Sequence, residues 1–287
     1  MTLDQRKRLL GRLQRRLTLR GLRPNTQETY LRMARQFLEA VDKPPARVTR
    51  GDVERYLLGL LDAGRCMRTR NVALASIRFL LHATTARDVT VGIPHGKVEE
   101  RLVTVLTGPE IERVLAATQS AKYRAIFMLA YGAGLRIGEV CALQVGDIDS
   151  QRGLIHVRAG KTGERYVPLG KRVLALLRDY WKAHRPPGPE LFPGRGARRT
   201  LCRNSVKRVL DKVAREAGID NRETPHTFRH TCATHLLDSG VDVRSVQVML
   251  GHHSIKSTAR YLHVSQARLA ALPSPLDLLG TARGSRL

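Results

Sequence analysis

Four side chains suited to phosphoryl transfer stand close together near the C-terminus. His226, Arg229, His252 and Tyr261 fall within 36 residues. A tyrosine hydroxyl has a pKa of about 10, so it attacks phosphorus only with a proton acceptor nearby and with positive charge at the transition state. A guanidinium stays charged and binds two phosphate oxygens at once. This stretch therefore predicts covalent phosphate chemistry at Tyr261, provided that another arginine and a proton donor come from elsewhere.

Two earlier residues are candidates for those missing parts. Arg136 follows the helix-breaking run Gly132-Ala-Gly134, where a new helix is expected to begin, and it would be the second phosphate ligand. Lys161 lies in an expected hairpin turn and would be the general acid that protonates the leaving oxygen. The simpler alternatives are a surface arginine at a helix start and an ordinary turn lysine.

The histidine spacing also raises the alternative of a zinc site. His226 and His230 are four residues apart, and Cys232 is close in sequence. However, HTFRH lacks the glutamate of HExxH, and the chain has no cysteine pair at metal-ligand spacing. Pro225 suits a first helical turn after Thr224, which would place His226 and Arg229 one turn apart on the same face. We therefore expect phosphate chemistry there, with no metal and no cofactor.

The net charge of +25 indicates an extended polyanionic partner, most simply nucleic acid. The 50 basic residues include 40 arginines; coding bias explains arginine over lysine but not 50 basic against 25 acidic residues. The excess is spread over the chain, with a net charge of +11 in residues 1–95 and +14 in the remainder. Both halves would therefore be attracted to phosphates.

The chain has no sequence features of export or membrane insertion. Its four cysteines are widely spaced, which favours reduced thiols. The N-terminus lacks an apolar signal region, and no 18-residue apolar run occurs. A cytoplasmic protein without membrane contact is expected.

The first part of the chain predicts a helical domain over residues 1–90, followed by a linker over 91–101. Residues 1–23 fit either a helix or a partly ordered arm. Further helices are expected from Asn25 or Thr26, from a capping box at Thr49 and Asp52, and from Thr69. Four arginines on the later helices are candidate phosphate ligands, with a merely soluble surface as the alternative: Arg65, Arg68, Arg70 and Arg78.

The second domain is predicted over residues 102–287 as mainly α with a small β-sheet. A capping box at Thr107 and Glu110 starts its first helix. The β-rich runs 154–157 and 165–169 predict a hairpin, and helices are expected over 171–184 and 201–217.

The motifs in their order identify a family resemblance. YGAGLRIGEV (131–140), GKTGE (160–164), HTFRH (226–230), LGH (250–252) and Tyr261 resemble the tyrosine recombinase (phage integrase) family, most of all its Xer-like and transposon-associated members. The similarity covers essentially the whole chain. It implies a core-binding (SAM-like) helical domain ahead of an α-rich catalytic domain of the DNA breaking-rejoining enzyme fold.

The resemblance also implies a function and a set of roles. The protein would be a site-specific recombinase or integrase that cleaves and rejoins double-stranded DNA through a 3′-phosphotyrosine, without ATP or metal. Glu139 resembles the acidic residue that supports the first arginine. Bacterial relatives suggest a cytoplasmic, nucleoid-associated protein that binds one site as a homodimer and forms a homotetramer in the synapse. The catalytic residues would be Tyr261, Arg136, Lys161, His226, Arg229 and His252.

Two other functions remain open from the sequence. A topoisomerase of type IB uses the same phosphotyrosine chemistry without exchanging partners, and an inactive relative would bind DNA alone. The complete set of six residues argues against the inactive relative. Apolar residues after Tyr261 suggest a tail that docks on a neighbouring subunit, or equally one that packs on its own domain, and the docking tail favours the recombinase.

Overall fold

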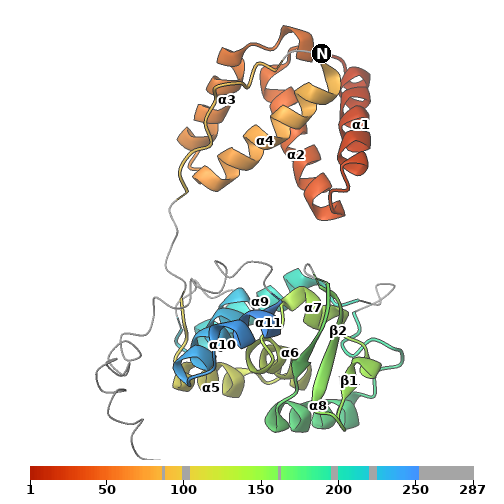
Figure 1. The fold of residues 1–287 in the computed structure, drawn as a ribbon, viewed down its shortest axis with the longest axis vertical. Helices are drawn as coiled ribbons and strands as arrows, with labels where there is room; N and C mark the ends of the chain where they lie inside the picture. Colours follow the sequence, from red (N-terminus) through yellow and green to blue (C-terminus); the bar gives the residue numbers. More distant parts are fainter. Residues whose placement is uncertain (86–87, 99–103, 161–162, 195–199, 220–224, 252–287) are drawn as a thin grey trace, which may run out of the picture. The chain divides into compact units, whose positions relative to one another are not determined.

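The computed structural model describes residues 1–85, 88–98, 104–160, 163–194, 200–219 and 225–251. The chain divides into two compact units, Met1–Arg101 and Leu102–Leu287, here called unit 1 and unit 2. Each unit has a hydrophobic core of its own. The described elements are mostly helices, with one small sheet in unit 2, so the predicted fold class is confirmed (Figure 1).

Unit 1 is built from the helices α1 (Leu3–Leu19), α2 (Pro24–Val41), α3 (Arg50–Asp62) and α4 (Met67–Thr84), with a short 3-10 turn, η1 (Pro45–Arg47). Leu13 and Leu17 of α1 are completely buried, so residues 3–19 form a packed helix rather than an arm. Thr49 and Asp52 form the predicted capping box at the start of α3. The helices α2 and α4 each begin two residues or so earlier than predicted, without a side-chain cap.

The segment after α4 is attached to unit 1. Ile93 is 3% exposed and belongs to the core of unit 1. The backbone N–H of Gly96 donates to Asn71 Oδ1 at 2.9 Å, and Asn71 Nδ2 donates back to Gly96 O at 2.8 Å. Residues 91–96, which lie within the predicted linker, are therefore held against α4.

Unit 2 packs its helices around α6 (Ala121–Gly132). Residues 125–130 of α6 are all buried, which explains the nearly continuous apolar run of this helix. The helices that pack directly against it are α5 (Gly108–Ala117), α7 (Ile137–Ala142), α8 (Lys171–His184) and α10 (Pro225–Asp238), and α9 (Arg203–Glu216) and α11 (Val243–Leu250) pack against α10. The predicted capping box of Thr107 and Glu110 starts α5. This arrangement places the ends of α7, α10 and α11 near one another (Figure 1).

The predicted hairpin is present in unit 2 as part of an antiparallel sheet with the order β1-β2-β3. The strands are β1 (Ile148–Asp149), which follows the 3-10 turn η2 (Val145–Asp147), β2 (Leu154–Gly160) and β3 (Gly163–Pro168). Ile155 pairs with Val167, and both are completely buried. Gly160 pairs with Gly163 at the end of the hairpin. The sheet thus brings the side chains of β3 next to α7 and α11.

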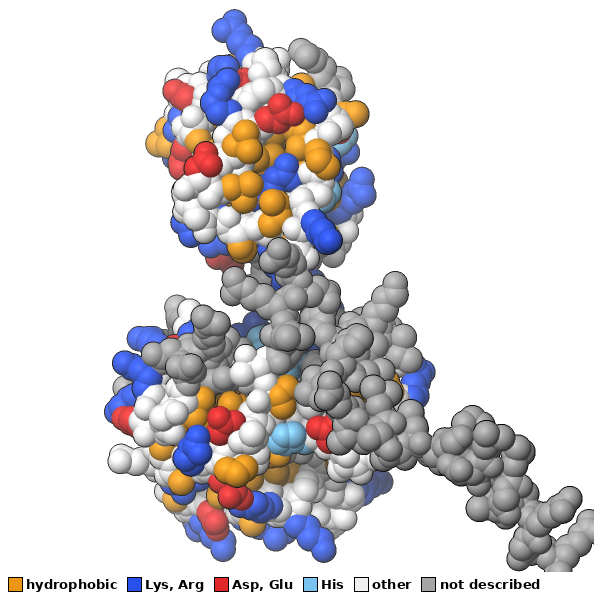
Figure 2. Space-filling model, turned by 90° about the vertical axis from the view of Figure 1, so that its left-hand side faces the viewer, with side chains coloured by type: hydrophobic (Ala, Val, Ile, Leu, Met, Phe, Trp, Pro, Cys, Tyr) orange, Lys and Arg blue, Asp and Glu red, His pale blue; other side chains and the backbone are white. Residues whose placement is uncertain are grey.

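Basic side chains are spread over the surface of both units. Figure 2 shows Lys and Arg on the visible face of each unit, rather than gathered in one place. Among the described residues, no helix is long and apolar enough to cross a membrane. All four cysteines are free thiols.

Candidate active site

The centre of the site is a buried carboxylate, Glu139, in the first turn of α7. Its side chain is 4% exposed. Arg136, the residue before α7, donates from its backbone N–H to Glu139 Oε2 and from Nη1 to Oε1, both at 2.9 Å. These two contacts fix the Arg136 side chain at the start of the helix. With 21% of its side chain exposed, Arg136 is also open to a ligand from solvent.

Arg229 enters the same cluster from α10. The residue is 3% exposed. Its Nη1 donates to Gly134 O at 2.6 Å and lies 3.9 Å from Glu139 Oε2, and its Nη2 donates to Leu250 O. Gly134 permits this packing because its φ is +60° and an added Cβ would lie 2.8 Å from Leu250 Cδ2. The run Gly132-Ala-Gly134 is therefore a close-packed turn that holds Arg229 beside Arg136.

A third arginine, Arg165, reaches the cluster from β3. It binds both oxygens of Glu139, through Nη1 at 3.0 Å and Nη2 at 2.8 Å, and its side chain is 9% exposed. The sequence reasoning missed this residue. A signal was present, since alternation along β3 puts Arg165 on the same face as the buried Val167, with Tyr166 on the exposed side. A buried arginine on the inner face of a strand needs an acidic partner.

The three arginines also share the C-terminal end of α11. Arg165 Nε donates to Met249 O at 2.9 Å, Arg229 Nη2 donates to Leu250 O, and Arg136 Nη2 lies 3.4 Å from Gly251 O. The last carbonyls of a helix have no partner within the helix and carry its negative dipole end. Three consecutive carbonyls are thus held by cations from three different elements. The chain leaves this point towards His252.

His226 lies in the first turn of α10, one turn before Arg229, and is exposed. Surrounding protein nevertheless desolvates its ring, and this desolvation lowers the pKa of His226 below its usual value of 6.5. The positive charges of Arg229, Arg136 and Arg203 lower the pKa further. The imidazole is therefore mainly neutral at pH 7 and has a nitrogen that accepts a proton.

Glu139 carries the balancing negative charge. Burial acts to raise the pKa of Glu139, but the hydrogen bonds from Arg165 and from the backbone and side chain of Arg136 outweigh it and lower that pKa to about 2. One carboxylate thus faces three guanidinium groups, which leaves an excess of positive charge at the cluster. Such an excess at a partly open position favours an anion with several oxygens.

The structure therefore brings together Arg136, Glu139, His226 and Arg229 among the residues predicted from sequence. Lys161, His252 and Tyr261, as well as the tail after Tyr261, lie outside the described residues. Within the described part of the chain, no group of three or more His, Cys, Asp or Glu is arranged to hold a metal ion.

Two of the four arginines predicted to bind DNA phosphates in unit 1 have partners inside that unit. Arg70 Nη1 donates to Pro94 O at 2.6 Å. Arg78 donates from Nε to Thr90 Oγ1 at 3.1 Å and from Nη2 to Ile93 O at 2.8 Å. These two side chains hold the segment after α4, whereas Arg65 and Arg68 are exposed.

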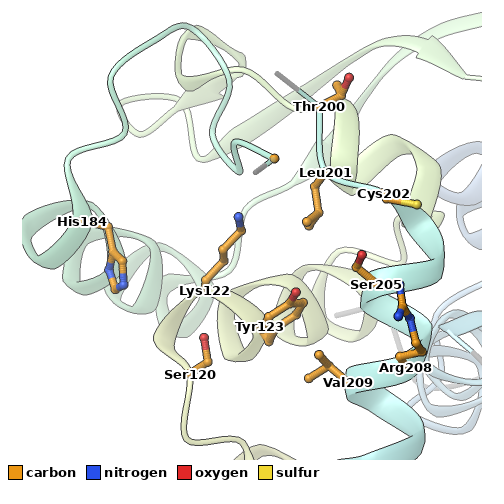
Figure 3. Close-up of a pocket in the computed structure, with 11 residues that line it drawn as sticks. Ser120, Lys122, Tyr123, His184, Thr200, Leu201, Cys202, Ser205, Arg208 and Val209 are labelled. Carbon is orange, nitrogen blue, oxygen red and sulfur yellow. The ribbon is translucent and has the colours of Figure 1, made fainter. Parts of the chain in front are cut away.

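A separate hollow of about 690 Å³ lies between α6, α8 and α9 in unit 2. Figure 3 shows Lys122 and Tyr123 of α6 on one side and Ser205 and Arg208 of α9 on another. None of the predicted catalytic residues is among its described lining residues. The hollow is therefore distinct from the arginine cluster.

The chain is similar to known proteins over most of its length. Residues 104–268 match the phage integrase family, and residues 9–90 match the phage integrase N-terminal SAM-like domain. A putative integrase/recombinase, y4qK, from Sinorhizobium fredii is 35% identical over 275 residues, which cover 94% of this chain and 89% of that protein. The tyrosine recombinase XerA from Pyrococcus furiosus is 31% identical over 268 residues, which cover 92% of each chain.

Solved structures show the same fold. The crystal structure of a lambda integrase dimer bound to a COC′ core site superimposes with a TM-score of 0.75 and covers 91% of this chain and 95% of that one, at 20% identity. At this identity the likeness speaks for the fold alone. The family model matches more than half of the chain, and relatives above 30% identity match nearly all of it. The protein therefore belongs to the phage integrase family of tyrosine recombinases, enzymes that cleave and rejoin DNA strands.

Proposed function

We propose that this recombinase cleaves double-stranded DNA at specific sites with Tyr261 as the nucleophile, and that a 3′-phosphotyrosine conserves the energy of the broken bond for rejoining. The observation that carries the proposal is the arginine cluster. Arg136, just before α7, and Arg229, in α10, are far apart in sequence, yet both contact Glu139 and the end of α11. A phosphodiester with its two non-bridging oxygens fits two adjacent guanidinium groups.

The chemistry then follows from the charges. Attack by the tyrosine oxygen places additional negative charge on the non-bridging oxygens in the transition state, and Arg136 and Arg229 stabilise it. Loss of one such donor typically costs about 3 kcal/mol in the barrier. The neutral His226 ring accepts a proton or a hydrogen bond as the tyrosine hydroxyl is deprotonated.

The remaining roles fall to residues outside the described part of the chain. Lys161 would protonate the leaving 5′-oxygen, and His252 would donate a hydrogen bond to a non-bridging oxygen. The described neighbours support both roles, because the pair Gly160–Gly163 brackets residue 161 at the hairpin end, and Gly251 lies within reach of Arg136. Positive charge from these side chains supplies what a metal ion supplies in many phosphoryl transfers, so the reaction needs no metal.

Both units would hold the DNA duplex through its phosphates. In unit 1, arginines of α1 and of the turn after it line a hollow of about 420 Å³, with Ala83 of α4 beside them: Arg12, Arg15, Arg16 and Arg20. All four are exposed. We add this surface to Arg65 and Arg68 as the phosphate-binding part of unit 1, in place of Arg70 and Arg78, because those two hold the segment after α4.

The recombinase would act as a homodimer on one site and as a homotetramer in the synapse, where the tail after Tyr261 docks on a neighbouring subunit. Solved relatives include a lambda integrase dimer bound to a core site and a lambda integrase tetramer bound to a Holliday junction. Deletion of the residues after Val264 should abolish tetramer formation and leave DNA binding by the monomer. Unchanged assembly of the deleted protein would contradict the docking role.

The test of the proposal is a DNA substrate with a nick beside the cleavage position, which traps the covalent intermediate. The wild type should form a protein–DNA adduct in the presence of EDTA. Tyr261→Phe should form none, while Tyr166→Phe, at a 57% exposed tyrosine of β3, should react normally. An adduct with Tyr261→Phe, or a strict requirement for Mg²⁺, would refute the mechanism. Relaxation of supercoiled DNA that lacks a specific site would favour a topoisomerase instead.

A further inference from the structure

Arg165 connects three elements of unit 2 at the active-site cluster, although no part of the proposed chemistry assigns it a role. It lies on β3, it donates hydrogen bonds to both carboxylate oxygens of Glu139 on α7, and its Nε donates to Met249 O at the end of α11. We propose that Arg165 is a positioning residue for strand cleavage, which keeps Glu139 from competing with the phosphate for Arg136 and Arg229. This inference rests on the function proposed above.

The first step of the argument is the charge balance around Glu139. Its carboxylate is 4% exposed, so its charge is stabilised by neighbouring protein groups and hardly by solvent. Arg165 binds it through two parallel N–H···O contacts of 2.8 and 3.0 Å, the strongest geometry for this pair. With both oxygens engaged by Arg165, Glu139 accepts one hydrogen bond from the Arg136 side chain, through Nη1, and one from the Arg136 backbone, and it lies 3.9 Å from Arg229 Nη1. The Nη2 of Arg136 lies 3.4 Å from Gly251 O instead.

The second step is what the removal of Arg165 would do. The carboxylate would remain ionised beside the two other arginines, and its free lone pairs would draw their guanidinium groups inwards. Arg229 is the nearest candidate, because only a short movement would bring Nη1 from 3.9 Å to hydrogen-bond distance. A guanidinium that is engaged by a carboxylate stabilises a phosphate transition state less well, because its charge is already compensated.

The third step is the link to α11. Arg165 is the partner of Met249 O, and the two next carbonyls are held by Arg229 and Arg136. The loss of Arg165 therefore removes the hydrogen bond to Met249 O, the first of the three carbonyls held at the end of α11, shortly before His252 in the sequence. Arg165 itself is 9% exposed, and its donors point to protein acceptors. It acts through its neighbours and does not add to the affinity for DNA.

The experiment compares Arg165→Met, Glu139→Gln and the double variant in the nicked-substrate assay at saturating DNA. The cleavage rate constant and the Kd for intact DNA are measured separately. Arg165→Met should lower the cleavage rate constant about 100-fold and change the Kd by less than about 3-fold. The double variant should cleave at least about 10-fold faster than Arg165→Met, because the uncharged amide no longer competes for Arg136 and Arg229.

This rescue separates a positioning role from a merely structural one, since a second change in a damaged fold would lower the rate further. Arg165→Lys keeps the positive charge and the aliphatic part of the side chain but loses the two parallel N–H donors. Its cleavage rate constant should fall between those of the wild type and Arg165→Met. This variant tests the proposal even if Arg165→Met is unstable. Arg152→Met is the control from the turn between β1 and β2, because Arg152 is 79% exposed and its partner Asp149 is 40% exposed. It should cleave within about 2-fold of the wild type.

The outcomes distinguish this inference from the proposed function. Suppose that the wild type forms a Tyr261-dependent adduct. The positioning role is then wrong, and the mechanism stands, if Arg165→Met cleaves within about 3-fold of the wild-type rate. The same holds if the rate of the double variant is reduced by the product of the two single-variant reductions. If the wild type forms no Tyr261-dependent adduct, the mechanism itself is wrong.

Discussion

The ionised state of Glu139 is open to a direct test through acid stability. Its pKa of about 2 lies well below the ordinary value for glutamate, about 4.3. A depressed folded-state pKa contributes stability that is complete above the unfolded pKa and is lost as the pH falls towards the folded one. The shift corresponds to about 3 kcal/mol at pH 7, roughly half of that at pH 3 and a small remainder at pH 2. Glu139→Gln lacks this pH-dependent contribution.

The measurement is urea unfolding of the full chain followed by tryptophan fluorescence. The chain has a single tryptophan, Trp181, which lies on α8 and so reports on unit 2 alone. The stability difference between the wild type and Glu139→Gln should shrink by about half between pH 7 and pH 3. Glu112→Gln, at a 69% exposed carboxylate of α5, is the control and should change stability by less than about 0.5 kcal/mol. A difference for Glu139→Gln that does not vary with pH would refute the buried counter-charge.

Three further predictions concern the packing at Gly134, the protonation of His226 and the segment after α4. Gly134→Ala should destabilise unit 2 by about 2 to 4 kcal/mol in the same urea assay, because strain at positive φ adds to the clash with α11. The control Gly218→Ala, at a glycine with a φ of +66° and open space around it, should cost about 1 kcal/mol. Equal costs for the two variants would argue against close packing at the turn. Cleavage should slow as the pH falls through the lowered pKa of His226, and Arg203→Gln should raise that pKa in an NMR titration, since it removes one of the positive charges that lower it; no upward shift would contradict the electrostatic cause. Arg78→Met should increase cleavage by thermolysin within residues 88–98, and an unchanged proteolysis rate would mean that Arg78 does not hold this segment.

The parts of the fold that the sequence predicts well are those decided by neighbouring residues. The capping boxes at Thr49 and Thr107 each lie within four consecutive residues, so the sequence alone predicts them. The hairpin follows from the β-rich runs and the glycines between them. Helix starts without a side-chain cap, such as those at Pro24 and Met67, carry no such local signal, and their predicted positions are two residues or so too late.

The candidate site shows the same division. Arg136, Glu139, His226 and Arg229 are identified by short motifs, and the structure places them together. Arg165 escapes such reasoning because its partners, Glu139 and Met249, lie 26 and 84 residues away. Only the alternation along β3 marks it as inward-facing. The DNA-contact prediction for Arg70 and Arg78 likewise did not anticipate that the segment after α4 takes up both side chains.

The central claim, covalent catalysis by Tyr261, is tested most directly by mapping the trapped adduct. The wild type is reacted with the nicked substrate in EDTA, the DNA is digested, and the nucleotide-bearing peptide is identified by mass spectrometry. The account predicts a 3′-linked nucleotide on Tyr261 and on none of the other six tyrosines of the chain. A nucleotide on another residue, or strand cleavage without any covalent peptide, would contradict it.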